Sequence, residues 1–259
     1  MTSWARFLRG RLAEAQLALM LLTRLPAGRI KDPLTPMADA CWAFPLAGLA
    51  VGVIAASALW SALWLGLPSS IAAGLALTAG VLATGGLHED GLADLADGLG
   101  GGQTRDRKLE IMRDSRIGSY GALALILAIG LRWSATATLA NQDALRAGAA
   151  IVAIAVASRG GLPVVLALLP PARKDGLGHA TASPTAARIA AAAAIGLLAL
   201  ALLLGSRAAL TIALGQSLTL LLMARLALRQ IGGQTGDVLG AMQQVTDLCA
   251  LLALVWLGR

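Results

Sequence analysis

The chain has 259 residues, of which 57% are hydrophobic and only 14% are charged, and its formal net charge is +7. Soluble domains carry about 25% charged residues, so this composition excludes an ordinary soluble enzyme and indicates a polytopic membrane protein. In such a protein an excess of Lys and Arg first suggests cytoplasmic loops and anionic headgroups. With one Tyr and two Phe, the chain has no basic and aromatic interleaving, so we expect no nucleic-acid partner.

Residues 1–36 form an N-terminal segment that we expect to lie at the membrane interface. Several arginines precede a short apolar run, Leu17–Leu22, and Glu14 and Arg24 flank that run. No small-residue cleavage site follows it, so we predict an amphipathic interfacial helix and not a signal peptide. The proline-punctuated stretch Pro26–Pro36 ends the segment.

The rest of the chain alternates between apolar stretches and short polar breaks. A transmembrane helix needs about 20 apolar residues, and the breaks separate stretches of roughly that length. We therefore predict an all-α, polytopic integral membrane helical bundle of about seven transmembrane helices, in one domain covering residues 1–259. The expected spans are Cys41–Gly66, Ile71–Gly86, Ser119–Ala140, Ala144–Leu169, Ala186–Gly205, Ala208–Leu228 and Val238–Leu257.

Three polar segments occupy alternate connections of this bundle: residues 84–118, 170–185 and 229–237. If the N-terminus is inside, all three lie on the same side of the membrane. They hold most of the loop Lys and Arg, and basic loops stay cytoplasmic. The pattern predicts a multi-pass membrane protein, with one site assembled at its cytoplasmic face.

Residues 84–118 concentrate charge between apolar segments, which is costly to place in lipid without a function or a wet loop. They include seven of the 14 acidic residues of the chain and five basic ones. The acids are Glu89, Asp90, Asp94, Asp97, Asp106, Glu110 and Asp114, and the bases are Arg105, Arg107, Lys108, Arg113 and Arg116.

The aspartates of this stretch predict a metal site. Asp90, Asp94 and Asp97 are spaced i, i+4, i+7 and so project from one face of a helix. Like charges on one face repel unless a cation lies between them, and hard carboxylate oxygens favour Mg²⁺ or Mn²⁺. Glu110 and Asp114 repeat the i, i+4 spacing on a second helix, which would make a charged helix pair on the cytoplasmic side and could complete the ligand set.

Glycines and basic residues in the same stretch suit a phosphate. Gly98 and Gly100–Gly102 are expected to form the hinge between the two helices and to let backbone N–H groups approach a phosphate. The basic residues would neutralise a diphosphate during phosphoryl transfer. A solvated charged loop with internal ion pairs, or headgroup anchoring by the arginines, is the alternative interpretation.

Three positions outside this stretch also carry candidate chemistry. Asp237 would be either the N-cap of the last span or a further metal or substrate ligand. Asp247 lies in an apolar segment, where a carboxylate is a functional candidate, and it could pair with Arg132 or Arg159. His179 is a weaker candidate in a polar loop.

These residues carry a resemblance to a known family. His88-Glu89-Asp90-Gly91-Leu92-Ala93-Asp94 with Asp97-Gly98, followed by residues 110–118, resembles cobalamin synthase, also called adenosylcobinamide-GDP ribazoletransferase. The segments 22–26, 44–48, 158–159, 172–178 and 232–241 resemble the family's other patterns, in the same order along the chain. The chain departs from the family at Asp247, where a glutamate is expected.

The resemblance implies that adenosylcobinamide-GDP and α-ribazole, or its phosphate, give adenosylcobalamin, or its phosphate, and GMP, with Mg²⁺ as cofactor. It implies catalytic roles for Asp90, Asp94, Asp97 and His88. The implied metal ligands are Asp90, Asp94, Asp97, Glu89, Glu110 and Asp114. The implied substrate-binding residues are Arg105, Lys108, Arg113, Arg116, Arg159, Arg173, Lys174 and Asp237. The identity of the general base, the number of metal ions and a homo-oligomeric state stay open.

Two other functions remain as alternatives. The aspartate run loosely resembles that of the CDP-alcohol phosphatidyltransferases, although here Ala93 is followed by Asp94 where that motif has an arginine. An ion-coupled transporter is the second alternative, but transporters usually place such residues near mid-membrane on broken helices.

Overall fold

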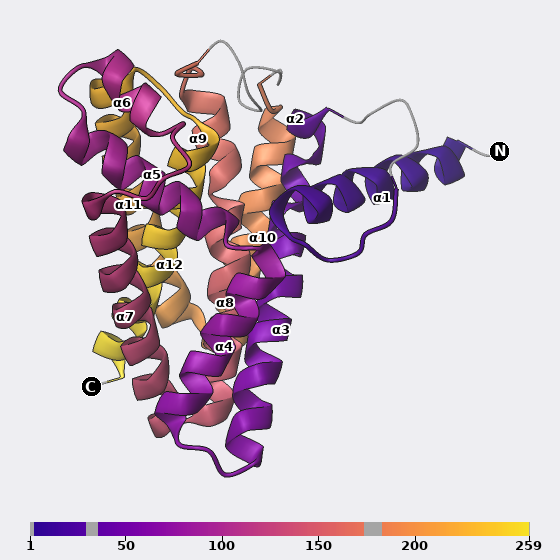
Figure 1. The fold of residues 1–259 in the computed structure, drawn as a ribbon. Helices are drawn as coiled ribbons and strands as arrows, with labels where there is room; N and C mark the ends of the chain where they lie inside the picture. The colour runs from indigo at the N-terminus through magenta and orange to yellow at the C-terminus, as the bar shows by residue number, and fades with distance from the viewer. Residues whose placement is uncertain (1–2, 30–35, 174–182, 259) are drawn as a thin grey trace.

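The computed structural model describes residues 3–29, 36–173 and 183–258, and over these ranges the chain folds into helices without a strand. The helices stand side by side as one elongated bundle (Figure 1). Among the described residues, six helices are long and apolar enough to cross a membrane, or seven if the bent pair α4 and α5 counts as one crossing. The prediction of a polytopic helical membrane protein is confirmed.

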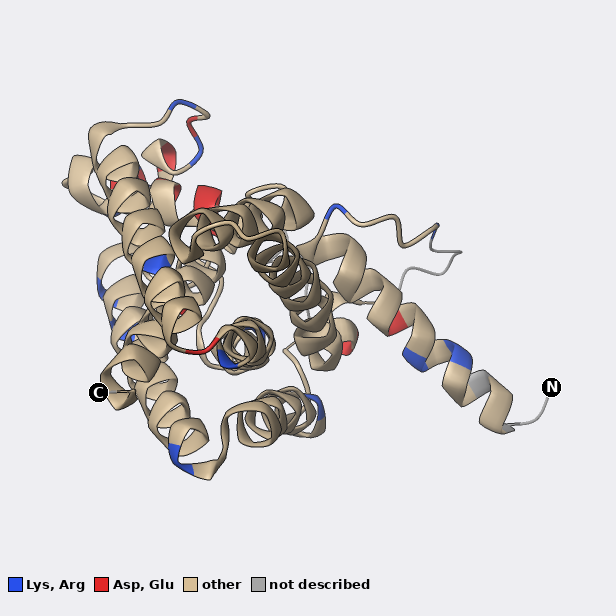
Figure 2. Ribbon diagram, turned by 90° about the horizontal axis from the view of Figure 1, so that it is seen from below, with Lys and Arg blue, Asp and Glu red and all other residues tan. Residues whose placement is uncertain are grey.

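The bundle helices lie where the apolar pattern places them. The first crossing consists of α2 (Met37–Ala40), the 3-10 turn η1 (Cys41–Ala43) and α3 (Phe44–Trp64), and the fourth is broken after α8 (Ala144–Gly160), where α9 (Leu162–Leu168) begins. The others are α4 (Ser69–Thr84), α7 (Ser119–Gln142), α10 (Ala186–Leu204), α11 (Ser206–Ile231) and α12 (Gly236–Leu257). Their ribbons carry few charged positions, as the view from below shows (Figure 2).

A sharp bend follows α4 and sets the direction of the next helix. The 16 residues of α4 rise by about 24 Å, somewhat less than the ~30 Å hydrocarbon core. Gly85 and Gly86 then take φ angles of 67° and 73°, which only glycine adopts readily. The chain turns by 88° into α5 (Leu87–Gly101), so α5 runs across the bundle instead of along it (Figure 1).

The glycines at the end of α5 do not form the hinge that the sequence suggests. The helix continues through Gly101, and the break before α6 (Arg105–Ile111) is confined to residues 102–104. Gly98 and Gly100 serve close packing instead, because a Cβ atom on Gly98 would lie 2.5 Å from Met112 Cγ. The predicted hinge at Gly98–Gly102 is therefore wrong in its extent.

The three polar segments meet at the same end of the bundle, as expected. Arg105 donates one hydrogen bond of 2.8 Å to the main-chain oxygen of Ile231 and another of 2.8 Å to that of Ala172. The main chains of Ala172 and Gln234 are joined by a hydrogen bond of 2.9 Å. Helix α6 thus fastens the segments before α10 and before α12 to each other.

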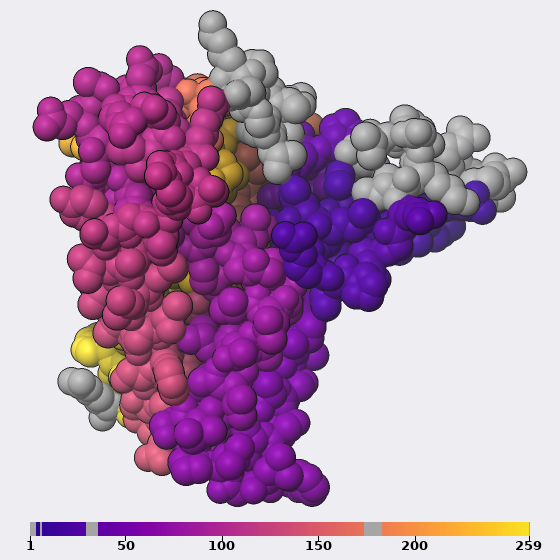
Figure 3. All heavy atoms as spheres, viewed as in Figure 1, coloured from indigo at the N-terminus to yellow at the C-terminus, as the bar shows by residue number. Residues whose placement is uncertain are grey.

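The N-terminal helix α1 (Ser3–Leu22) projects from the side of the bundle (Figure 3). Its far end exposes Trp4, Phe7, Leu8 and Leu12. Its near end is anchored by Glu14, which is buried and accepts a hydrogen bond of 2.5 Å from the indole nitrogen of Trp42 and forms ion pairs with Arg11 and Arg188.

Candidate active site

A cleft of about 600 Å³ opens between the end of α1, the bend before α5 and the segment that leads into α7. Asp90 and Asp94 both line it, so the first two of the three spaced aspartates do share a face. The rest of the wall includes Thr23, Arg24 and Ser115. With Thr84, which also lines it, the cleft therefore combines two carboxylates with a guanidinium and three hydroxyl groups.

Helix α12 brings a further carboxylate to this site through an unusually close approach to α5. A Cβ atom on Gly91 would lie 2.8 Å from the main-chain oxygen of Asp237, and one on Gly240 would lie 3.3 Å from His88 Cα. The two helices can touch at this crossing only because both positions are glycine. The contact carries Asp237, a residue far away in sequence, to the neighbourhood of Asp90 and Asp94.

Negative charge accumulates around Asp94. Partial burial, together with the carboxylates of Asp90, Asp237 and Asp97, raises the pKa of Asp94 to about 7, while Arg173 opposes the shift. A carboxyl group whose neighbours repel its charged form in this way is stabilised by a cation. The electrostatics of the cleft thus fit a metal ion or a cationic ligand.

Asp237 itself does not cap the last helix, which corrects one of the two alternatives. The cap of α12 is Thr235, whose hydroxyl accepts a hydrogen bond from the main-chain nitrogen of Val238 at 3.2 Å. Asp237 instead pairs with Arg173 at 3.6 Å. Lys174 and His179, two further candidates, lie outside the described residues.

Asp97, the third spaced aspartate, is fully engaged with the backbone of α7. Its two carboxylate oxygens accept hydrogen bonds from the main-chain nitrogens of Gly118 at 2.7 Å and of Gly121 at 2.8 Å. These N–H groups belong to the first turn of α7, where backbone donors lack partners within the helix. Asp97 therefore caps α7 from a neighbouring helix.

Glu110 and Asp114 do not share a helix face, so that prediction is wrong. Helix α6 ends at Ile111, and Asp114 lies in the turn beyond it. Glu110 pairs with Arg107 at 2.7 Å and Asp114 with Arg116 at 2.7 Å, and the Arg116 guanidinium lowers the pKa of Asp114 to about 2. Both acids, with Arg113, line a second cleft of about 480 Å³ that does not include Asp90 or Asp94.

Arg105 and Lys108, two of the predicted substrate-binding cations, have structural roles. Arg105 bonds to the main-chain oxygens described above, and Lys108 is buried and donates a hydrogen bond to Gln230 Oε1. Both side chains hold α6 against the end of α11. They hold the surrounding segments in place, and neither side chain lines the cleft that contains Asp90 and Asp94.

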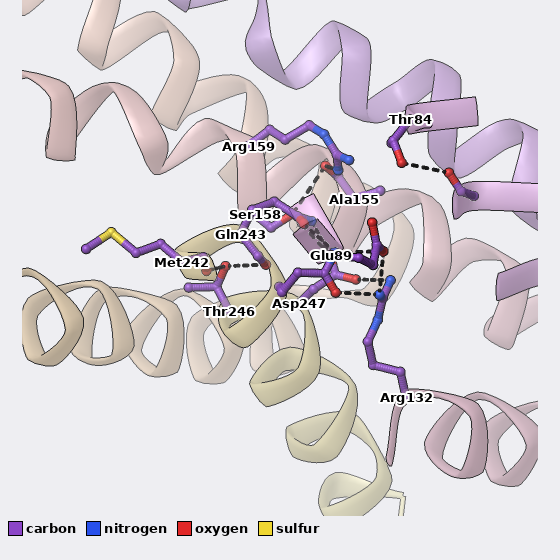
Figure 4. A network of polar contacts seen from close by, with 12 residues as sticks. Thr84, Glu89, Arg132, Ala155, Ser158, Arg159, Met242, Gln243, Thr246 and Asp247 are labelled. Atoms are coloured by element: carbon purple, nitrogen blue, oxygen red, sulfur yellow. Dashed lines mark hydrogen bonds and ion pairs between the residues drawn. The ribbon is translucent and has the colours of Figure 1, made fainter. Parts of the chain in front are cut away.

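His88 and Glu89 point inward from α5, on the opposite side to the cleft. They are 2% and 9% exposed and line a buried chamber together with Arg159. In this chamber Arg132 forms ion pairs with Glu89 at 3.3 Å and with Asp247 at 3.0 Å (Figure 4). The predicted pairing of Asp247 with an intramembrane arginine is confirmed, and the partner is Arg132.

Arg24 is the residue that reasoning from the sequence passed over. It precedes Leu25-Pro26 in the N-terminal segment, and its side chain packs over Gly85, where a Cβ atom would lie 2.7 Å from Arg24 Cγ. Its main-chain nitrogen donates to the oxygen of Ala83 at 2.8 Å. The motif around Arg24 belongs to the family pattern, and that was the available signal.

The chemistry of the cleft suits Mg²⁺ bound together with a diphosphate. Among the described residues, no group of three His, Cys, Asp or Glu side chains converges as a complete protein cage. Mg²⁺ is usually held by one or two carboxylates plus phosphate oxygens and water. Asp90 and Asp94, with the charge repulsion that raises the pKa of Asp94, match that smaller donor set.

Comparison with known proteins gives a consistent result. The family described as cobalamin-5-phosphate synthase matches residues 14–255. The adenosylcobinamide-GDP ribazoletransferase of Bradyrhizobium diazoefficiens is 50% identical over 246 residues, which are 95% of this chain and 94% of the relative. The protein of the same name from Mesorhizobium japonicum is 46% identical, over 93% of this chain and 92% of the relative. That from Azorhizobium caulinodans is 45% identical, over 96% of this chain and 97% of the relative. No solved structure matches the chain.

Proposed function

The chain belongs to the cobalamin-5-phosphate synthase family and is a membrane-embedded transferase of cobalamin biosynthesis, and from this premise we propose its substrates and mechanism. It joins adenosylcobinamide-GDP to α-ribazole, or to α-ribazole 5′-phosphate. The products are adenosylcobalamin, or its 5′-phosphate, and GMP. The observation that carries the proposal is the cleft in which Asp90, Asp94 and Arg24 lie together.

The transfer is a substitution at phosphorus. A hydroxyl group of the ribazole attacks the phosphorus attached to cobinamide, a new P–O bond forms, and the bond to GMP breaks. The electron pair of that bond leaves with GMP, and the attacking hydroxyl loses its proton. Bound Mg²⁺ would supply charge neutralisation on the diphosphate oxygens.

The residues of the cleft have different roles in this reaction. Asp90 and Asp94 hold the metal-bound diphosphate, with Asp237 as the neighbouring carboxylate. Arg24, an exposed guanidinium on the same wall, binds phosphate oxygens, for which its fork of donors is suited. One of the two cleft carboxylates accepts the proton, because His88 faces the buried chamber and does not line the cleft.

We place this cleft at the cytoplasmic face of the bacterial inner membrane. The end of the bundle that carries α5 and α6 also carries the basic polar segments, and basic segments are retained in the cytoplasm. The opening lies beside the bundle end, so a bulky corrinoid can approach from water while only its nucleotide end enters.

The test is release of GMP by purified protein supplied with adenosylcobinamide-GDP, α-ribazole and Mg²⁺. We expect the native protein to release GMP and Asp94→Asn to release none, while Asp106→Asn, which changes an exposed carboxylate of α6, retains native activity. Exhaustive chelation by EDTA should stop the reaction, and added Mg²⁺ should restore it.

Two results would contradict the proposal. Folded native protein that releases no GMP would refute the substrates, and consumption of CDP-diacylglycerol in the same assay would favour the phosphatidyltransferase alternative. Full turnover after chelation would refute the requirement for a metal.

A further inference from the structure

The chamber beneath α5 lies within the bundle, and its apolar wall carries several polar and charged side chains. It has a volume of about 70 Å³ and is lined from six helices, by side chains that include His88, Arg132, Arg159 and Asp247. Asp247 is the eleventh residue after the start of α12 at Gly236, a rise of about 16 Å. The chamber therefore lies well inside the helical bundle, where a buried polar group without a partner is costly.

A network of ion pairs and amide groups forms one wall of the chamber (Figure 4). Arg132 donates to Gln244 Oε1 at 2.7 Å, and Gln244 Nε2 donates to Glu89 Oε1 at 2.9 Å. Ser158 Oγ donates to Asp247 Oδ1 at 3.2 Å. This wall ties α5 to α7, α8 and α12.

Several buried atoms of the chamber have no hydrogen-bond partner among the described residues. They are both ring nitrogens of His88, Oε2 of Glu89, Nε of Arg132 and Nε of Arg159. The two guanidinium nitrogens can only donate, the carboxylate oxygen only accepts, and a neutral imidazole offers one donor and one acceptor. The unmet groups are therefore three donors and two acceptors.

This inventory identifies the kind of occupant. A bare cation would leave the donors unmet, and an anion would leave the acceptors unmet. Two arginines and two carboxylates also balance in charge, so no net charge calls for an ion. An occupant that both donates and accepts is required. The chamber volume of about 70 Å³ exceeds the roughly 10–15 Å³ that a cavity needs to hold one water molecule.

We propose that the chamber is an internal water site, in which ordered waters complete the hydrogen bonding of His88, Glu89, Arg132 and Arg159. The waters link the first turn of α5 to the bundle. Thr84 lines both the chamber and the cleft, and Glu89 precedes Asp90 directly. The hydrated network thus acts on the cleft by fixing the direction of α5, with Glu89 and Arg132 as positioning residues.

The chain offers a variant that displaces the waters. Gly80 lines the chamber, and a Cβ atom there would meet only Ala55 Cβ at 3.8 Å and Val51 Cγ1 at 4.0 Å. Gly80→Leu therefore introduces an apolar side chain beside the chamber without a backbone clash. Gly130 is exposed and a Cβ atom there would meet nothing within 4 Å, so Gly130→Leu is the matched control.

Hydroxyl-radical labelling by an X-ray pulse in H₂¹⁸O tests the water directly. Radicals formed from bound water label the side chains beside it. We expect His88 to gain ¹⁸O in the native protein and in Gly130→Leu, and several-fold less in Gly80→Leu. Met242, which is fully buried and does not line the chamber, should stay unlabelled in all three. His88 left unlabelled in the native protein, or labelled equally in Gly80→Leu, would overturn the proposal.

The positioning role rests on the proposed function and is measured separately. In Gly80→Leu we expect the Mg²⁺ concentration for half-maximal GMP release to rise several-fold, with an unchanged KM for α-ribazole. The thermal stability should fall, because the displaced waters leave buried polar groups without partners. An unchanged Mg²⁺ dependence in a variant that has lost the His88 label would remove the positioning role. Labelling needs no turnover, so its outcome is independent of the substrates.

Discussion

Asp97 offers a sharp test of the geometry, because the sequence assigns it to a metal and the structure shows it capping a helix. Asp97→Ala removes the acceptor of two backbone N–H groups, those of Gly118 and Gly121. Hydrogen bonds to a charged group contribute about 1.5–3 kcal/mol each, and measured losses of helix caps are about 0.5–2 kcal/mol. Because Asp97 is buried and serves with both oxygens, we expect Asp97→Ala to lower the free energy of unfolding by about 3 kcal/mol.

Asp97→Asn keeps one acceptor oxygen, so the expected loss is smaller, about 1 kcal/mol. The assay is chemical denaturation in detergent followed by circular dichroism, with Asp106→Asn as the control because that carboxylate is exposed in the first turn of α6. The Mg²⁺ concentration for half-maximal activity should change little in Asp97→Asn, because Asp97 acts on Asp94 only through its charge. A large shift in that concentration, without loss of stability, would show that Asp97 binds the metal and would refute the capping role.

Arg24→Ala should raise KM for adenosylcobinamide-GDP by about tenfold, since one charged hydrogen bond to a phosphate is lost. KM for α-ribazole should stay unchanged. An unchanged KM for adenosylcobinamide-GDP in the variant would place the diphosphate elsewhere. Arg105→Ala should lower the free energy of unfolding by about 2 kcal/mol, because it removes two hydrogen bonds to main-chain oxygens. The control Arg107→Ala breaks the exposed ion pair with Glu110 and should lower the free energy of unfolding by less than about 0.5 kcal/mol. Similar losses for both variants in chemical denaturation would contradict the role of Arg105. A reporter inserted within residues 103–108 should give a cytoplasmic signal, and a periplasmic signal would reverse the orientation.

The sequence by itself determined the membrane bundle, the place of each crossing and the meeting of the polar segments. The transfer of a side chain into hydrocarbon depends mainly on that side chain, so apolar stretches identify the spans without knowledge of their neighbours. The transfer cost of a charged side chain into hydrocarbon likewise marked the acids of residues 84–118 as a candidate site. It also predicted that Asp247 pairs with an arginine, because charge in or near a membrane needs a partner.

Only the tertiary structure decided which way these side chains face. The bend at Gly85 and Gly86 turns α5 across the bundle, so Asp90 lies in the cleft while Glu89 lies in the buried chamber. The ends of α6 and α7 decide that Asp114 leaves the predicted helix face and that Asp97 meets backbone donors. The contribution of Arg24 depends on α1 packing against that bend. Such directions arise from contacts between segments far apart in the chain, and a local spacing of residues does not contain them.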